Sequence, residues 1–239
     1  MKLFLIRRLK IAFTWLQLHR IFGFFSGFHL NLFYMTELSR WARQNKSVAF
    51  NDFPSKWDYN KRFGLYDYVF EQAQLADKDI TYLEFGVAQG ESFRWFLKKN
   101  TQPGSRFHGF DTFTGLPEDW GPFKKGYFDN KSTPPDINDT RGQFHQGLFQ
   151  QTLPAFLKEL VRRDKLVVML DADLYSSTLF VLTSLAPHLR EGDIILFDEF
   201  AVPTHEFRAF LDFTRSYYFD LELIGAANNY YFAAFRVKR

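Results

Sequence analysis

The sequence of 239 residues contains no cysteine. Disulfide bonds, thiolate metal sites and cysteine nucleophiles are therefore excluded, and this composition fits a reducing compartment. The chain also lacks an apolar run of the roughly 20 residues that a membrane-spanning helix needs, because His19 and Arg20 interrupt its apolar N-terminus. No small-residue cleavage site of a signal peptide follows that segment. We therefore expect a cytoplasmic protein, with association to a membrane as an open alternative.

Acidic residues are scarce near the N-terminus, where eight basic residues up to Lys46 stand against a single acid, Glu37. The whole chain has a formal charge of only +3, which gives no reason to expect a nucleic-acid partner. Aromatic residues make up 20% of the chain, so some apolar surface needs a partner. Residues 1–35 fit helices that pack on the main domain or on a second subunit of a homo-oligomer. The alternative is peripheral membrane contact, in which basic side chains bind anionic headgroups and aromatic ones enter the acyl boundary.

Strand and helix patterns alternate beyond residue 60, which is typical of an α/β fold with a doubly wound, mostly parallel sheet. We predict a helical extension and linker over residues 1–60 and a single domain over residues 61–239. Only the segment GAANN separates the last two strands, so these two are expected to be antiparallel. The expected strands are 80–85, 106–111, 166–170, 193–197, 220–224 and 231–237, and the expected helices are 61–76, 92–99, 153–162, 176–188 and 204–217.

A long polar segment rich in glycine and proline, residues 112–143, interrupts this alternation. A loop of that length in a compact domain usually serves as a lid or a binding loop. We expect it to shape an acceptor pocket together with the aromatic N-terminus. Phe113, Trp120 and Phe123 are the candidates to line that pocket.

Two glycines mark the turn after the first expected strand, in the stretch YLEFGVAQGESF. A strand followed by glycines and a helix exposes backbone N–H groups and a helix N-terminus to a ligand. The turn lacks the G-x-G of a dinucleotide site and the Gly-Lys-Ser/Thr of a phosphate loop. Glu84 favours an amine-bearing ligand over a pyrophosphate, and Asp111, at the end of the next strand, can accept hydrogen bonds from both ribose hydroxyls. S-adenosylmethionine carries an amine and a ribose without a phosphate, and therefore fits both acids.

Five segments, in this order, closely resemble the macrocin and mycinamicin O-methyltransferase family: YLEFGVAQGESFRWF, FHGFDTFTGLPEDW, GLFQQTLPAF, LDADLYSST and DIILFDEF. The similarity runs from about Leu65 to the C-terminus. It implies a class I, Rossmann-like methyltransferase fold with a seven-stranded sheet, S-adenosylmethionine as the methyl donor, a sugar hydroxyl as the acceptor and a requirement for Mg²⁺. The cofactor contacts that it implies are Glu84, Gly86 and Gly90 around the methionine part, Asp111 on the ribose, and Gly147, Leu148 and Phe149 near the adenine, with Ser92, Phe113 and Asp171 as further candidates.

Acidic residues end two later strands: Asp171 and Asp173 follow one, and Asp198 and Glu199 follow the next. If these strands run in the same direction, their four carboxylates meet at one edge of the sheet. Such crowding requires a cation or raised pKa values, and oxygen ligands without cysteine favour Mg²⁺. The resemblance implies Asp173, Asp198 and Glu199 as metal ligands, with Asp173 also placed to take the proton of the acceptor.

These observations predict an S-adenosylmethionine-dependent, magnesium-assisted O-methyltransferase that acts on a hydroxyl of a sugar or glycosylated small-molecule metabolite, as in natural product biosynthesis. His145 and His205 lie on loops near the same edge and are alternative bases. One rival function is a metal-dependent glycosyltransferase of the GT-A type, in which the Asp-x-Asp of residues 171–173 would hold a nucleotide-sugar diphosphate through a metal. Another is a non-catalytic, membrane-associated binding protein, although unused buried carboxylates would be costly.

Overall fold

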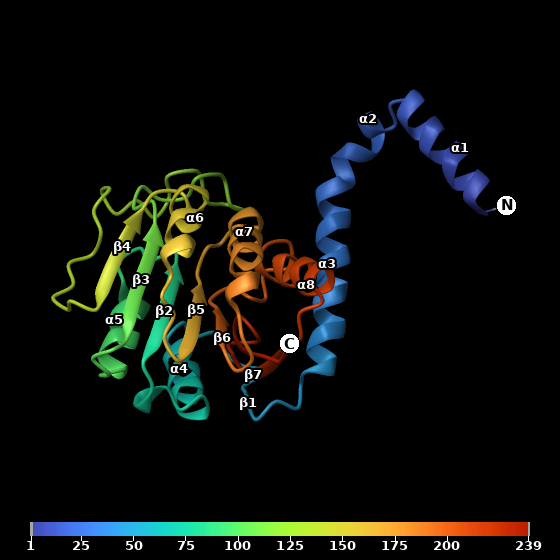
Figure 1. The fold of residues 1–239 in the computed structure, drawn as a ribbon. Coiled ribbons are helices and arrows are strands. Elements are labelled where there is room, and N and C mark those ends of the chain that lie inside the picture. Colours follow the sequence, from blue (N-terminus) through green and yellow to red (C-terminus); the bar gives the residue numbers. More distant parts are fainter. Residues whose placement is uncertain (1, 239) are drawn as a thin grey trace.

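One eight-stranded sheet organises the chain, as the computed structural model of residues 2–238 shows (Figure 1). The strand order is β1-β7-β8-β6-β5-β2-β3-β4. All neighbouring strands are parallel except β8, which is antiparallel to both β6 and β7. The strands are β1 (Phe50–Asn51), β2 (Ile80–Phe85), β3 (Arg106–Asp111), β4 (Gly142–Gln146), β5 (Lys165–Leu170), β6 (Ile194–Phe197), β7 (Leu221–Ala227) and β8 (Phe232–Val237).

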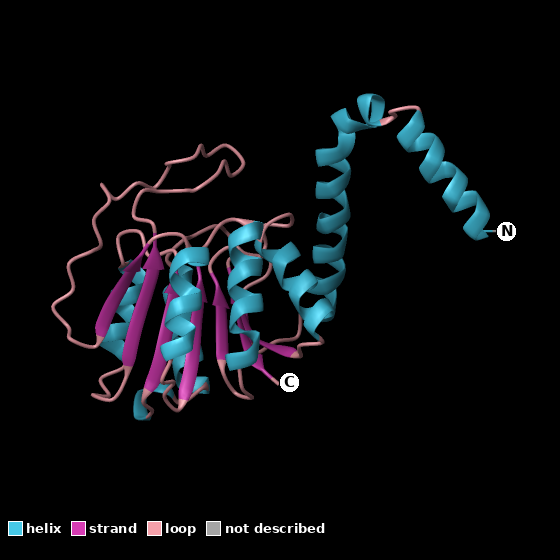
Figure 2. Ribbon diagram, turned by 45° about the horizontal axis from the view of Figure 1, so that its top comes forward, coloured by secondary structure: helices cyan, strands magenta, loops and turns pink. Residues whose placement is uncertain are grey.

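Helices cover both faces of the sheet (Figure 2). The helices on one face are α4 (Lys61–Gln72) and α5 (Glu91–Lys99), and those on the other are α6 (Phe149–Glu159), α7 (Tyr175–Leu185) and α8 (Glu206–Tyr217). Short 3-10 helices follow α4 at Leu75–Asp77 and α7 at Ala186–His188. The two helical layers enclose two hydrophobic cores, one on each side of the sheet.

The central strand β2 contributes to both cores because successive side chains of a strand point to opposite faces. Leu83 and Phe85 pack in the core that faces α6, α7 and α8. Ile80 and Tyr82 pack in the core that faces α4 and α5. Glu84 follows the second pattern and therefore points toward α5, away from the α6 side.

The predicted architecture is confirmed, with one correction to the number of strands. The sheet has eight strands and not seven, because the two-residue strand β1, in the segment expected to be a linker, pairs with β7. Strand β4 was expected to be part of the long loop, since its sequence GQFHQ has only one large apolar residue. The antiparallel arrangement of the last two strands is as predicted, and β8 inserts between β6 and β7.

Four helical segments precede the sheet: α1 (Lys2–Trp15), α2 (His19–Phe22), a 3-10 helix (Gly23–Phe25) and α3 (Ser26–Gln44). From Tyr34 onward α3 packs beside α8, with Trp41 against the core and Arg215 of α8 paired with Glu37 at 2.7 Å. The segments before Tyr34 project away from the sheet and its helices (Figures 1 and 2). Among residues 2–238, no helix combines the length and the hydropathy needed to cross a membrane.

Trp41 fixes α3 to the body of the protein and should contribute strongly to stability. Its ring lies against five aromatic rings: Phe200, Phe207, Phe210, Tyr230 and Phe235. We expect Trp41→Ala to lower the free energy of unfolding by about 3 kcal/mol, or the melting temperature by about 6–12 °C, because truncation leaves a cavity among these rings. The exposed Trp15 is the matched control, since Trp15→Ala should leave thermal unfolding unchanged. Equal melting temperatures for both variants would contradict this role of Trp41.

Candidate active site

The turn after β2 has the backbone geometry that only glycine adopts readily. Gly86 has a φ of +91°, and Gly90, which precedes α5, has a φ of +73°. A Cβ atom on Gly86 would lie 1.7 Å from the backbone carbonyl oxygen of Asp171. The turn can therefore pass this close to the end of β5 only because residue 86 has no side chain.

Asp111, at the end of β3, holds the glycine turn in place. Its Oδ2 accepts hydrogen bonds from the backbone N–H groups of Val87 (2.8 Å) and Ala88 (2.9 Å), and its Oδ1 accepts one from the N–H of Phe113 (2.8 Å). An ionised carboxylate has about four acceptor positions, so Oδ1 keeps capacity for one more donor. Asp111 lines the cavity described below, where that position can receive a ligand hydroxyl.

Glu84 lies beneath the turn and is fully buried. Its two carboxylate oxygens accept hydrogen bonds from the hydroxyls of Tyr82 and Ser92. Burial raises the pKa of Glu84 to about 8, so the side chain is mostly protonated at neutral pH. Glu84 and Ser92 thus form a buried support under the turn, and neither side chain lines the cavity.

Four carboxylates meet at the carboxyl ends of β5 and β6, as the sequence predicts. Burial, together with the neighbouring carboxylates, raises the pKa values of Asp171, Asp173 and Glu199. Asp173 also has a φ of +57°, a left-handed conformation that is uncommon outside glycine and costs free energy. Crowded carboxylates and a strained backbone at one point are typical of a functional site.

Asp198 lies deeper than the other three acids, and burial raises its pKa although three side chains of the protein offset part of this effect. Its Oδ1 accepts a hydrogen bond from the Tyr66 hydroxyl (3.1 Å), and its Oδ2 accepts one from the Tyr59 hydroxyl (3.0 Å). The buried Arg62 guanidinium lies 3.8 Å from Oδ2. Each oxygen of Asp198 thus accepts one hydrogen bond, and Asp198 does not line the cavity described below, so its role as a metal ligand stays a prediction.

The remaining acids allow a smaller metal site than the sequence predicts. Among residues 2–238, no group of three or more His, Cys, Asp or Glu side chains is close enough to hold one ion. Glu199 accepts a hydrogen bond from the Tyr231 hydroxyl on Oε1, whereas its buried Oε2 has no partner within the described chain. Because Mg²⁺ often takes one or two carboxylates and completes its shell with water, Asp173 and Glu199 fit this ion as a pair.

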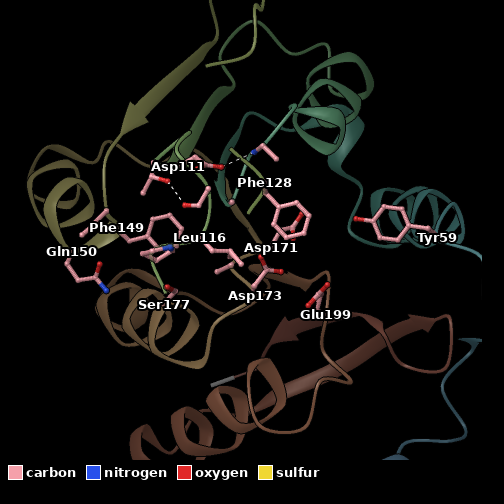
Figure 3. A pocket seen from close by; sticks show the side chains of 17 residues that line it. Tyr59, Asp111, Leu116, Phe128, Phe149, Gln150, Asp171, Asp173, Ser177 and Glu199 are labelled. Carbon is pink, nitrogen blue, oxygen red and sulfur yellow. Dashed lines mark hydrogen bonds between the residues drawn. The ribbon is translucent and has the colours of Figure 1, made fainter. Parts of the chain in front are cut away.

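A cavity connects the glycine turn with the carboxylates (Figure 3). Of the predicted site residues, it is lined by Gly86, Asp111, Leu148, Phe149, Asp171, Asp173 and Glu199. Those that do not line it are Glu84, Gly90, Ser92, Phe113, Gly147 and Asp198. The same cavity contains side chains that the sequence did not single out: Tyr59, Leu116, Phe128, Gln150 and Ser177.

Several other candidates lie outside the cavity. His145 stacks on Phe110 and has its Nε2 3.2 Å from Nδ1 of His108, on the face covered by α6, and His205 accepts a hydrogen bond from the backbone of Tyr175. Neither histidine lines the cavity that contains the carboxylates. Three lid aromatics proposed for the acceptor pocket, Phe113, Trp120 and Phe123, pack in hydrophobic clusters, whereas Phe128 reaches the cavity.

Comparisons with known proteins agree with this fold. Residues 83–200 match a family described as a methyltransferase domain. The chain is similar in structure to the O-methyltransferase NovP, with a TM-score of 0.57, 16% identity and coverage of 88% of this chain and 100% of that chain. It is also similar to the calicheamicin methyltransferase CalS11, with a TM-score of 0.56, 21% identity and coverage of 85% and 91%.

The ligand-free form of CalS11, described as a TDP-rhamnose 3′-O-methyltransferase, gives a TM-score of 0.51 at 21% identity, with coverage of 85% of this chain and 92% of that chain. The comparison with curated proteins gives no match. Identities this low show a shared fold, and the family match covers the segment that carries the glycine turn and both acidic strand ends. Residues 83–200 therefore match a methyltransferase domain, and the chain has the fold of the O-methyltransferases to which it is similar.

Proposed function

We propose that the protein transfers a methyl group from S-adenosylmethionine to a hydroxyl of a sugar or glycosylated small molecule. The observation that carries this proposal is the single cavity lined by Gly86 and Asp111 at one end and by Asp173 and Glu199 at the other. One end suits a nucleoside and the other suits a hydroxyl that must lose a proton. The methyltransferase domain would begin near Tyr34, before the predicted boundary at residue 61, because Trp41 packs in the core and β1 pairs with β7.

The donor would occupy the end of the cavity that contains the glycine turn. Asp111 has one free acceptor position for a ribose hydroxyl, while Leu148 and Phe149, at the start of α6, offer apolar contact for an adenine ring. Gln150 and Ser177 add polar groups along the same wall. S-adenosylmethionine supplies a sulfonium methyl group, whose C–S bond breaks as the acceptor oxygen forms the new C–O bond.

The acceptor would lie over Asp173 and Glu199. Asp173 lines the cavity beside Glu199 and is the side chain that we assign to take the hydroxyl proton. Tyr59 and Phe128 line the cavity and can pack on the apolar face of a sugar ring. Holding the oxygen in line with the methyl group supplies a large part of the rate, because it removes the entropic cost of orientation.

Magnesium would be held by Asp173 and Glu199, the pair that fits it. The ion would act as a Lewis acid that lowers the pKa of the acceptor hydroxyl. Asp198 has a different role in this proposal, since Arg62 and the two tyrosines fix it below the pair. The backbone N–H of Glu199 donates to the buried Glu206 at 3.0 Å, and this contact holds the end of β6 in place.

Calorimetry with S-adenosylhomocysteine and with UDP tests this function against the glycosyltransferase alternative. We expect S-adenosylhomocysteine to bind and UDP not to bind, because the cavity offers Asp111 for a ribose and no cationic side chain for a diphosphate. Methyl transfer to a panel of nucleotide sugars and glycosides then identifies the acceptor. Tight binding of UDP alone would refute the proposal, and cofactor binding without transfer to any hydroxyl would favour a non-catalytic protein.

A further inference from the structure

The first part of the chain, residues 2–33, forms an N-terminal arm with little contact to the rest of the protein. In both views it continues the line of α3 beyond α8, bends at α2, and returns with α1 away from the sheet (Figures 1 and 2). The rings of Phe13 and Phe22 stack at 5.7 Å across the bend. The first buried residue after the arm is Tyr34.

The arm exposes most of the large apolar side chains found at the surface. Of the 27 exposed large hydrophobic residues among residues 2–238, seventeen belong to it. They include Phe24, at 87% exposure, and Trp15, at 80%. The full set is Leu3, Phe4, Leu5, Ile6, Leu9, Ile11, Phe13, Trp15, Leu16, Ile21, Phe22, Phe24, Phe25, Phe28, Leu30, Leu32 and Phe33. So many exposed large apolar side chains in one segment indicate an interaction site for a protein or a membrane.

The charge of the arm distinguishes between these partners. The arm has five basic residues, Lys2, Arg7, Arg8, Lys10 and Arg20, and no acidic residue. A second copy of the arm would bring five further cations and no acid to pair with them, so contact between two arms would be repulsive. Anionic lipid headgroups provide the missing negative charge, and long basic side chains can reach them while their stems lie along apolar surface.

The length of the arm determines how it can meet a bilayer. Helix α1 has 14 residues and is therefore about 21 Å long, which is shorter than the hydrocarbon core of about 30 Å. Apolar residues surround α1 on all sides, and Arg7, Arg8 and Lys10 lie among them. Helix α1 is therefore too short to span the core, but its long basic side chains can reach the headgroups while the apolar side chains between them enter the acyl boundary.

We propose that the N-terminal arm binds the surface of an anionic membrane and attaches the methyltransferase domain to it. The arm projects beyond the edge of the sheet at which the parallel strands end (Figures 1 and 2). Attachment through the arm would place the membrane on the side of the domain that contains the cavity residues. This inference is independent of the identity of the methyl acceptor.

Vesicle flotation with the full chain tests the proposal. We expect binding to vesicles of phosphatidylcholine with phosphatidylglycerol and much weaker binding to phosphatidylcholine alone. The triple variant Arg7→Glu, Arg8→Glu, Lys10→Glu should lose about 100-fold or more in affinity for the anionic vesicles, since each basic residue near such a surface contributes about fivefold. The double variant Trp15→Ala, Phe24→Ala should also bind less, because both side chains are almost fully exposed.

The matched control is a variant with the same change of net charge in the long loop of residues 112–143, here called the lid. Lys124→Glu, Lys125→Glu, Lys131→Glu alters the net charge equally and should leave vesicle binding near the wild-type level. Binding of S-adenosylhomocysteine, unchanged in every variant, reports that the domain is folded. Equal loss in the lid variant would overturn the proposal. The proposal would also be overturned if the wild-type chain did not bind vesicles but formed a dimer in sedimentation experiments, and if the arm variants dissociated that dimer.

Discussion

Gly86→Ala is expected to abolish the binding of S-adenosylhomocysteine and to destabilise the fold. An alanine at a φ of +91° is strained, and its Cβ would lie 1.7 Å from the carbonyl oxygen of Asp171, a backbone atom that cannot rotate away. The N–H of Gly86 donates to the carbonyl of Phe110 (3.0 Å), and the N–H of Asp171 donates to the carbonyl of Phe85 (2.9 Å). Relief of the overlap must therefore separate β2 from β5 at the edge of the cavity.

The expected loss is at least about 3 kcal/mol in the free energy of unfolding, or about 6–12 °C in the melting temperature. Calorimetry and thermal unfolding measure the two effects. Gly121→Ala is the matched control, since Gly121 also has a positive φ (+52°) but an added Cβ would meet no atom within 4 Å. The control should show only the backbone cost, about 1–2 kcal/mol, with normal binding. Normal cofactor binding by Gly86→Ala would show that the turn does not form the donor site.

The same turn shows why part of the fold is predictable from sequence. Strands β2 and β3 have the predicted bounds because each is a buried run that ends at a turn with strong local signals. Strand β4 has no such run, and its side chains are half-buried at the edge of the sheet. It pairs with β3 only once the long loop has returned the chain to that edge. Non-local pairing of this kind leaves little signal in five residues.

The candidate site, like the fold, is predictable from the sequence only in part. The acids after β5 and β6 are predictable because they follow buried strands that run parallel. The partners of Asp198 are not predictable from the sequence. They are Tyr59, Arg62 and Tyr66, which precede Asp198 by more than 130 residues and contact it only in the folded chain. The position of Glu84 depends on the alternation of β2, which directs it toward α5 and away from the cavity. Gln150 adjoins the predicted pair Leu148 and Phe149, so proximity in sequence was the one signal available for it.

Asp173→Asn is expected to lower turnover by about 10²–10⁴-fold, while S-adenosylhomocysteine binds as before. The amide has nearly the same shape but cannot accept the hydroxyl proton. Asparagine also tolerates the left-handed backbone conformation, so the φ of +57° can be retained. In the wild-type protein EDTA should lower the rate and Mg²⁺ should restore it, whereas the variant should respond to neither. The exposed Asp164 provides the control, because Asp164→Asn should leave turnover and its EDTA response unchanged.

The stability of Asp173→Asn should increase although its turnover falls. This combination distinguishes a catalytic role of Asp173 from a structural one. The pKa of Asp173 is raised to about 7 by burial and by Asp198, so ionisation of this group opposes folding. That cost is absent below its ordinary pKa of 3.8 and grows until the pH passes about 7. Asp173→Asn should therefore be more stable than the wild type at pH 8, by about 0.5–2 kcal/mol, and no more stable at pH 3.

A residue that serves only the fold would show the reverse, with a loss of stability on substitution and little change in rate. Thermal unfolding at the two pH values, measured without metal, distinguishes these cases. A variant that is less stable at pH 8 would assign Asp173 a structural role. The combination of lost turnover and gained stability would mean that the crowded carboxylates are kept for chemistry, at a cost in stability that Arg62 offsets only in part at Asp198.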